Sequence, residues 1–275
     1  MHADELEEIQ IALLVDAIHK RYGYDFRNYA KASLKRRIRD FTRASGHDTI
    51  SDMIPPLLRD AAFGAKLIFA LSVTVSEMFR DPAFFGFLRK DVIPYLKTYP
   101  FVRIWHAGCS TGEEVYSLAI VLQEEGFYDR ATIFATDFNE LALDKAREGI
   151  YPLEKMKAYT SNYQRSGGTE SFTRYYRTGY EAAIMDAGLK KNITFADHNL
   201  VTDSVFSEMH LIVCRNVLIY FDRTLQNRVL QLFHDSLAHG GVLALGSKES
   251  LRFSRVADYY KELSGKWKIF QKKSI

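Results

Sequence analysis

The stretch that decides the fold is Arg103-Ile-Trp-His-Ala-Gly-Cys-Ser-Thr-Gly-Glu-Glu114, which passes from an apolar run through two glycines into a helical pattern. Gly108 and Gly112 allow the backbone to turn tightly and to approach a ligand closely. The stretch lacks the Lys of a triphosphate-binding loop and the Gly-x-Gly-x-x-Gly dinucleotide pattern. Taken alone, it fits either a cofactor loop or a plain turn in which Ser110 or Thr111 caps the helix.

Short apolar runs alternate with helical patterns on both sides of this turn. The apolar runs are 101–105, 131–135, 193–196, 211–214 and 242–245, and the helical patterns are 112–125, 140–148 and 223–237. The alternation predicts an α/β domain with a mainly parallel sheet, and residues 265–271 predict a final strand beside the run at 242. A Gly- and Tyr-rich segment at about 161–191 predicts a small antiparallel β insertion.

The first third of the chain instead carries apolar residues at helical spacing, as at Leu34, Ile38 and Phe41. We therefore predict two domains, an all-helical domain over residues 1–90 and the α/β domain over residues 91–275. Between residues 20 and 43 stand nine Lys or Arg against two Asp, although the whole chain has a net charge of only +3. Such a cationic helix attracts phosphates or an acidic protein surface, or it is simply a solvated face.

The composition is that of an ordinary globular protein, with 275 residues, 47% hydrophobic and 26% charged. No apolar run approaches the roughly 18 residues that a bilayer span needs, and the acidic first residues are unlike a signal peptide. Cys109 and Cys214 are too few for a disulfide framework or a metal cluster. We expect a cytoplasmic protein without membrane insertion and without a metal.

A second acidic position favours the cofactor interpretation of the glycine turn. Asp137 ends the next apolar run, 25 residues after Gly112, so its carboxylate is expected at the same edge of the sheet. There it could accept both ribose hydroxyls of an adenosine cofactor, or it could cap the helix that follows Asn139. Two acids and no phosphate-binding Lys favour an adenosine cofactor without phosphates, and S-adenosylmethionine fits that description.

Several ordered blocks resemble the CheR-type chemotaxis-receptor glutamate methyltransferases, over nearly the whole chain. They are Val73-Thr-Val-Ser-Glu-Met-Phe-Arg-Asp81, Ala107-Gly-Cys-Ser-Thr-Gly-Glu-Glu-Val-Tyr-Ser117, Ala135-Thr-Asp137, Asn199-Leu200 and Cys214-Arg-Asn-Val-Leu-Ile-Tyr-Phe-Asp222. The resemblance implies a Rossmann-like S-adenosylmethionine-dependent methyltransferase sheet with a small β insertion, preceded by an all-α domain. It also implies methyl ester formation on glutamates of methyl-accepting chemotaxis receptors, which tunes adaptation.

The resemblance further implies a set of site residues. Cofactor contacts would come from Thr74, Ser76, Arg80, Gly108, Glu114, Asp137, Asn199, Leu200, Arg215 and Asn216. Arg80 would pair with the carboxylate of the cofactor, Glu114 would lie near its ammonium, and Asp137 would hold its ribose. Arg80 and Tyr220 would be the catalytic residues, acting by placement and not by proton transfer. Arg37 would bind the substrate, whose methylation sites lie on a Glu-rich cytoplasmic helical bundle.

Ordinary structural roles stay open for some of these residues. Arg80 could pair with Asp81, Asn199 could cap a turn, and Tyr220 could be a core residue. His106 is interpreted as structural, because no partner stands at metal-ligand spacing.

Two other functions remain open at this point. A nucleic-acid methyltransferase would use the basic helix, but it would need a pocket for a flipped base, and no such pattern is visible. A non-catalytic module that senses S-adenosylmethionine would keep Gly108 and Asp137 but not Arg80 and Tyr220. A receptor glutamate, with a reference pKa of about 4.3, is already ionised at neutral pH and needs no general base. We therefore favour the receptor methyltransferase, as a monomer that does not bind nucleic acid.

Overall fold

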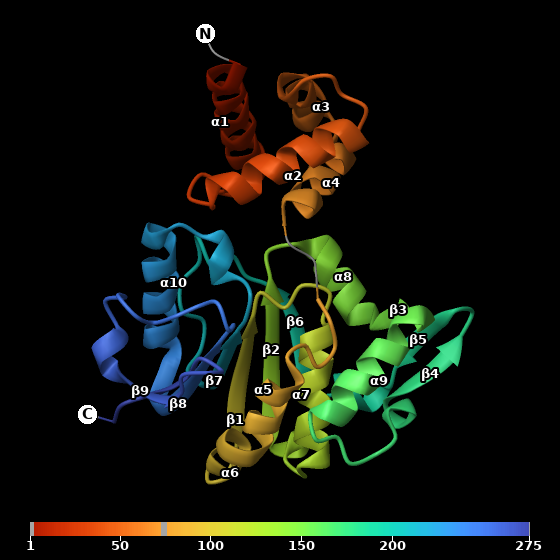
Figure 1. The fold of residues 1–275 in the computed structure, drawn as a ribbon, viewed down its shortest axis with the longest axis vertical. Helices are drawn as coiled ribbons and strands as arrows, with labels where there is room; N and C mark the ends of the chain where they lie inside the picture. Colours follow the sequence, from red (N-terminus) through yellow and green to blue (C-terminus); the bar gives the residue numbers. More distant parts are fainter. Residues whose placement is uncertain (1–2, 73–75, 275) are drawn as a thin grey trace. The chain divides into compact units, whose positions relative to one another are not determined.

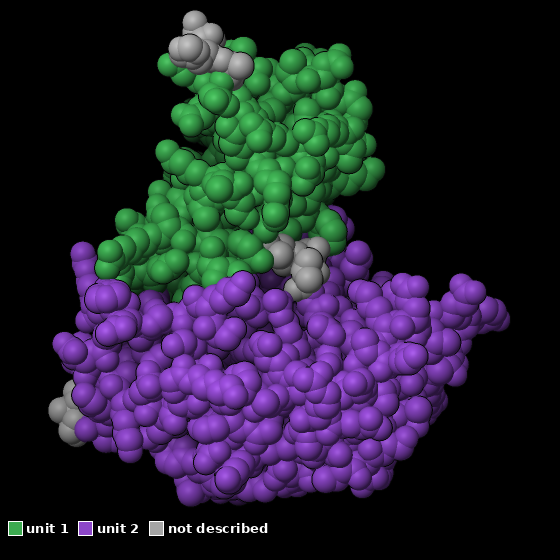
Figure 2. Space-filling model, in the orientation of Figure 1, with its two compact units in different colours: residues 1–73, 217–229 green, residues 74–216, 230–275 purple. Residues whose placement is uncertain are grey.

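The computed structural model describes residues 3–72 and 76–274, and the chain forms two compact units (Figure 2). The first unit comprises Met1–Val73 and Val217–Val229, and the second comprises Thr74–Asn216 and Leu230–Ile275. Residues 74–90, which we expected in the N-terminal domain, are thus part of the second unit. Phe84 and Phe85 pack in the core of that unit, and helical spacing alone does not reveal which core a helix joins.

Figure 1 shows the regular elements and labels all of them except β10. The α-helices are α1 (Ala3–Tyr22), α2 (Lys31–Ala44), α3 (Ile54–Arg59), α4 (Ala61–Leu71), α5 (Pro82–Phe87), α6 (Ile93–Leu96), α7 (Glu113–Glu124), α8 (Glu140–Glu148), α9 (Met156–Arg165) and α10 (Arg223–Ser236). The strands are β1 (Val102–Ala107), β2 (Ala131–Asp137), β3 (Ile150–Pro152), β4 (Tyr176–Gly179), β5 (Ala182–Met185), β6 (Ile193–Asp197), β7 (Met209–Cys214), β8 (Leu237–Leu245), β9 (Tyr260–Ser264) and β10 (Ile269–Lys272).

The first unit is helical, as predicted, and its core is built from apolar side chains of α1 to α4. Gly23, with a φ of +80°, ends α1, and its N–H donates to the His19 carbonyl at 2.9 Å. The later segment Val217–Val229 joins this unit through backbone pairing, because the Ala30 N–H donates to the Tyr220 carbonyl at 2.8 Å. Tyr220 therefore belongs to the helical unit although it follows a strand of the sheet in sequence.

The second unit contains a seven-stranded sheet in the order β6-β2-β1-β7-β8-β10-β9. Neighbouring strands from β6 to β8 are parallel, whereas β10 pairs antiparallel with β8 and β9 pairs antiparallel with β10. This is the predicted Rossmann-like α/β arrangement, and the predicted pairing of the last strand with β8 is confirmed. The carboxyl ends of β1, β2, β6 and β7 share one edge, which is where ligands bind in such sheets.

Alternation along β1 assigns its side chains to the two faces of the sheet. Trp105 points to the α10 face, where its ring centroid lies 5.3 Å from that of Phe233. Ile104 packs in the core that includes α7. His106 points to the same face as Ile104 and so faces α7.

The predicted antiparallel insertion is confirmed as a three-stranded sheet in the order β3-β5-β4. Its first strand, Ile150–Pro152, precedes the segment in which we expected it, and part of that segment forms α9. A three-residue strand is too short to display a period of two, so β3 could not be predicted from its residue pattern.

Within the described residues, no helix is both long enough and apolar enough to cross a bilayer.

Candidate active site

The glycine turn connects β1 to α7, with Gly108 at a φ of +75° and Gly112 at +89°. Gly112 itself is the N-cap of α7, so neither Ser110 nor Thr111 takes that position. A Cβ on Gly112 would lie 2.9 Å from the Cβ of Ala146 in α8. The second glycine of the turn therefore serves helix packing, in addition to its backbone conformation.

Asp137, at the end of β2, connects two loops through its carboxylate. Its Oδ2 accepts the Ser110 N–H at 2.8 Å and its Oδ1 accepts the Asn139 N–H at 3.0 Å. The side-chain cap of α8 is Asn139, whose Oδ1 accepts the Ala142 N–H at 3.3 Å. Burial raises the pKa of Asp137, although the backbone donors oppose the shift. Each oxygen retains acceptor capacity, so the carboxylate is suited to receive hydroxyl groups.

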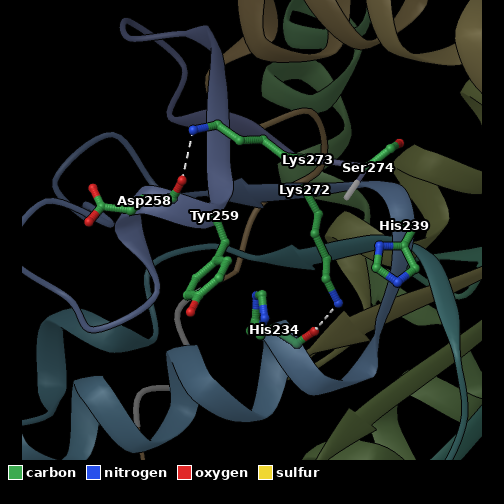
Figure 3. A pocket seen from close by; sticks show the side chains of 7 residues that line it. All are labelled: His234, His239, Asp258, Tyr259, Lys272, Lys273 and Ser274. Carbon is green, nitrogen blue, oxygen red and sulfur yellow. Dashed lines mark hydrogen bonds between the residues drawn. The ribbon is translucent and has the colours of Figure 1, made fainter.

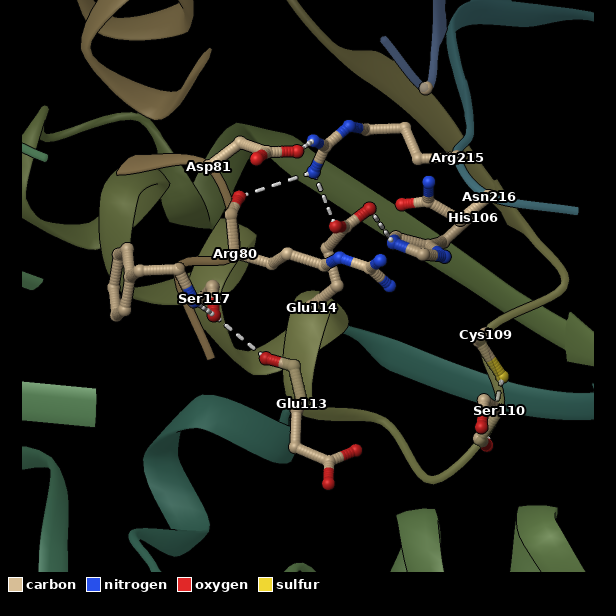
Figure 4. A network of polar contacts seen from close by, with 12 residues as sticks. Arg80, Asp81, His106, Cys109, Ser110, Glu113, Glu114, Ser117, Arg215 and Asn216 are labelled. Carbon is tan, nitrogen blue, oxygen red and sulfur yellow. Dashed lines mark hydrogen bonds and ion pairs between the residues drawn. The ribbon is translucent and has the colours of Figure 1, made fainter. Parts of the chain in front are cut away.

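A buried charge cluster lies beside the glycine turn (Figure 4). It consists of His106, Glu114 and Arg215, which are buried, and of Asp81, whose side chain is 39% exposed. Arg215 Nη1 donates to Glu114 Oε2 at 2.5 Å, and Nη2 donates to Asp81 Oδ2 at 2.6 Å. The Arg215 side chain is 2% exposed, and its guanidinium carbon lies 4.0 Å from the centroid of the Phe84 ring. Asp81 therefore pairs with Arg215 and not with its neighbour Arg80.

Glu114 is ionised in this cluster. Burial by itself would raise the pKa of its carboxyl group, but Arg215 and His106 outweigh burial, and the pKa lies below its usual value. His106 Nε2 is 3.2 Å from Glu114 Oε1. The site thus presents a fixed negative charge at the start of α7.

Arg80 supplies the complementary positive charge. Its side chain extends toward Glu114 and His106 in Figure 4, and its carbonyl accepts Arg215 Nη1 at 3.4 Å. The Arg80 guanidinium makes no hydrogen bond or ion pair with other residues that the structure describes, so it is available to an anionic ligand. Ser76 is half-buried nearby in the chain, whereas Thr74 lies outside the described residues.

The other predicted cofactor residues follow β6 and β7. Leu200 is buried, and Asn199 caps a turn, since its Oδ1 accepts the Val201 N–H at 3.0 Å. Capping a turn was the structural alternative for Asn199. Its contact with the adenine ring of the cofactor stays a prediction. Asn216 has a φ of +61°, and its N–H donates to Glu249 Oε2 at 3.1 Å.

Arg37 and Tyr220 meet within the first unit. The guanidinium carbon of Arg37 lies 4.8 Å from the centroid of the Tyr220 ring. Arg37 also donates from Nη1 to the Leu71 carbonyl, at the end of α4, at 2.7 Å. These contacts hold a half-buried Arg37 inside its own unit, and its predicted role in substrate binding stays a prediction.

Three residues of the site were not predicted from the sequence: Asp81, His106 and Glu249. Asp81 is the last residue of the sequence block that ends in Phe-Arg-Asp81. Its position directly after Arg80 could have indicated that it lies at the site. His106 was interpreted as structural because no partner stands at metal-ligand spacing. Its partner in the structure, Glu114, is eight residues away at the start of a helix. Glu249 lies in a loop without a motif, and it accepts both the Asn216 and the Gly246 N–H groups.

The charges of the site match the methionyl end of S-adenosylmethionine. An ionised Glu114 suits an ammonium group, and an uncommitted Arg80 suits a carboxylate. Three buried polar atoms of the site, Ser110 Oγ, His106 Nδ1 and Arg215 Nε, have no hydrogen-bond partner among the described residues, so they leave polar capacity for a ligand. Among the described residues, no group of three or more His, Cys, Asp or Glu side chains is arranged to hold a metal ion.

A separate cavity of about 290 Å³ lies at the amino end of β8 (Figure 3). It is lined by His234, His239, Asp258, Tyr259, Lys272, Lys273 and Ser274. The Lys272 ammonium donates to the carbonyls of His234 and Leu237, at 2.8 Å and 2.7 Å. None of its lining residues belongs to the predicted site.

Comparison with known proteins gives the family. Residues 74–269 match the model described as the SAM binding domain of CheR methyltransferase, and residues 9–72 match its all-alpha domain. Cher3 of Pseudomonas putida, which is named as a methyltransferase, is 50% identical over 99% of this chain and 100% of that protein. The chemotaxis protein methyltransferase of Listeria innocua is 34% identical over 85% of this chain and 87% of its own length. The same name is carried by a Borreliella burgdorferi protein that is 27% identical over 91% of each chain. The chain therefore belongs to the CheR methyltransferase family, and its cofactor is S-adenosylmethionine.

Proposed function

We propose that this methyltransferase forms methyl esters on specific glutamate side chains of methyl-accepting chemotaxis receptors, in the cytoplasm. The observation that carries the proposal is the pairing of an ionised, buried Glu114 with Arg215, beside an uncommitted Arg80. This arrangement is suited to a zwitterionic amino-acid group, and the methionyl end of S-adenosylmethionine is one. Homologues named as chemotaxis methyltransferases support the choice of a receptor as substrate.

The residues of this chain have binding and orienting roles in the proposed reaction. Arg80 would hold the carboxylate of the cofactor, Glu114 its ammonium and Asp137 its ribose. S-adenosylmethionine supplies an electrophilic methyl group on a positively charged sulfur. Fixing the reacting groups in line can account for much of the acceleration, because orientation alone is worth up to about 7–11 kcal/mol of barrier.

No general base is required, because the receptor glutamate is ionised at neutral pH. Arg80 and Tyr220 would therefore act by placement, and the rate should not follow an ionisation of Tyr220. The adenine pocket would be formed by Asn199 and Leu200 after β6, with Arg215 and Asn216 closing the site after β7.

The receptor would be attracted by the exposed cations of α2. Lys31, Arg36 and Arg43 are exposed and make no ion pair with other described residues. Arg37 is half-buried against Tyr220 and the Leu71 carbonyl, so its influence on the substrate would pass through the position of Tyr220. An acidic helical bundle is the complementary partner for such a surface.

The test is incubation of the purified protein with methyl-labelled S-adenosylmethionine and receptor membranes, followed by mild alkali. Label on the receptor that alkali releases as methanol is the expected result, because methyl esters are base-labile. Label on DNA or RNA would instead indicate a nucleic-acid methyltransferase. Cofactor binding without any labelled product would indicate a non-catalytic sensing module.

A further inference from the structure

His106 is the residue of the buried charge cluster to which the proposed reaction assigns no role. His106 is the next-to-last residue of β1, and its backbone is fixed on both sides by pairing with Ala135 of β2 and Val213 of β7. The residue is 3% exposed. Burial and pairing on both sides therefore restrict the position of the imidazole.

In the contact between His106 and Glu114, His106 is the hydrogen-bond donor. Glu114 is ionised, so its carboxylate can only accept, and Nε2 of His106 must therefore carry the hydrogen of the 3.2 Å contact. Nδ1 is buried and has no hydrogen-bond partner among the described residues. Nε2 is therefore the ring nitrogen through which the described residues hold the imidazole.

Glu114 is consequently held by one donor on each oxygen. His106 donates to Oε1 from β1, and Arg215 donates to Oε2 from the segment after β7. Arg215 is held in turn by Asp81. A glutamate side chain loses substantial conformational entropy when it is ordered, and these two donors order it before any ligand arrives.

We propose that His106 is a positioning residue for cofactor binding, which orients the Glu114 carboxylate toward the ammonium of the methionyl group. The inference rests on the proposed function, because it takes Glu114 as the partner of that ammonium. His106 acts through Glu114 and contributes to the affinity for the amino-acid end of the cofactor, not for its adenosine.

Isothermal calorimetry with two ligands separates this role from a general structural one. S-adenosylhomocysteine carries the ammonium, whereas 5′-methylthioadenosine keeps the adenosine and lacks the amino-acid end. His106→Leu should weaken S-adenosylhomocysteine about tenfold, as expected for loss of a hydrogen bond to a charged group. It should leave the dissociation constant of 5′-methylthioadenosine unchanged. His106→Gln, which retains an N–H near the position of Nε2, should restore most of the affinity.

The matched control is His234→Leu in the cavity of Figure 3. His234 is half-buried, and its buried Nδ1 likewise has no hydrogen-bond partner in the part of the chain that the structure describes, but it lies on α10 beside the amino end of β8. This variant should bind both ligands as the wild-type protein does. Should the Leu variant of His106 not fold, His106→Asn repeats the test, because its amide is too short to reach Glu114.

Two results would overturn the inference: unchanged binding of S-adenosylhomocysteine by both His106→Leu and His106→Asn, or equal weakening of the two ligands. Absence of S-adenosylhomocysteine binding by the wild-type protein would overturn both this inference and the cofactor site of the proposed function. Binding with the predicted pattern, together with receptors that stay unmethylated, would refute the proposed function and leave the role of His106 standing.

Discussion

The buried charge cluster of the second unit and the cationic surface of α2 use charge in opposite ways. In the cluster, Arg215 is 2% exposed and contacts two carboxylates, so each charge has a fixed position. On α2, Arg39 and Lys35 make ion pairs with Glu7, and other cations are exposed without a described partner. Buried pairs define geometry for a small ligand, whereas exposed cations act at longer range and are screened by salt.

This difference predicts that charge removal in the cluster affects folding and cofactor affinity, and that charge removal on α2 affects the encounter with the receptor.

The largest effect is expected from Arg215→Met. The substitution leaves Glu114 and Asp81 without their shared partner, and breaking a buried pair typically costs about 3–5 kcal/mol. Urea unfolding should show this loss, and calorimetry should show no binding of S-adenosylhomocysteine. The control Arg36→Met, on the exposed face of α2, should change the free energy of unfolding by less than about 0.5 kcal/mol. Similar losses in the two variants would contradict the comparison.

The next largest effect is expected from Asp137→Asn. Loss of a charged acceptor for the ribose hydroxyls should weaken S-adenosylhomocysteine by roughly ten- to a hundredfold. The measurement is the dissociation constant from calorimetry. Asp129→Asn is the control, because Asp129 precedes the same strand and its side chain is 86% exposed. An affinity within twofold of wild type would remove Asp137 from the site.

Arg37→Met tests the contact between α2 and Tyr220. The substitution removes the hydrogen bond to the Leu71 carbonyl and the cation–π contact, which together are worth about 1–3 kcal/mol. If Arg37 positions Tyr220, kcat should fall about tenfold while the dissociation constant of S-adenosylhomocysteine stays within twofold. A rise in KM for the receptor at unchanged kcat would instead support direct substrate binding by Arg37.

The pH dependence of stability tests the ionised state of Glu114. Its pKa is lowered in the folded protein by Arg215 and His106, against the effect of burial. The stabilisation that the carboxylate provides is therefore complete above its usual pKa near 4.5 and is lost as the pH falls through the lower folded-state value. The difference in unfolding free energy between wild type and Glu114→Gln should shrink below pH 4.5. A difference that grows on acidification would mean that the folded protein favours the protonated acid.

The smallest effect is expected from the double variant Arg36→Gln/Arg43→Gln. The KM for receptor membranes should rise about three- to fivefold at low salt, and the difference should vanish near 1 M salt, where the Debye length is about 3 Å. Affinity for S-adenosylhomocysteine should not change. Arg59→Gln, an exposed cation on α3, is the control. A salt-independent effect would argue against an electrostatic role for this surface.

Local sequence patterns were sufficient for much of the fold. The apolar runs of β1, β2, β6 and β7 each have the length and composition of a buried strand, and Gly23 and Gly108 mark places where the backbone turns. The three-residue β3 left no periodic signal. The unit to which α5 belongs depends on which core its Phe84 and Phe85 join.

The candidate site was predictable only where its residues stand in sequence blocks. Asp137 and Glu114 could be placed at one edge of the sheet because parallel strands end there. The pairing of Arg215 with Asp81, 134 residues apart, depends on the tertiary fold. The contact between His106 and Glu114 likewise needs both the strand face and the helix start to be known.

We propose that the buried charge cluster and Asp137 together hold S-adenosylmethionine at the carboxyl edge of the sheet. A crystal structure of the protein with S-adenosylhomocysteine tests it most directly. We expect the ammonium of the ligand within hydrogen-bond distance of Glu114, its carboxylate at Arg80 and its ribose hydroxyls at Asp137. Density for the ligand at another place, with Glu114 and Asp137 making only the contacts described above, would contradict it.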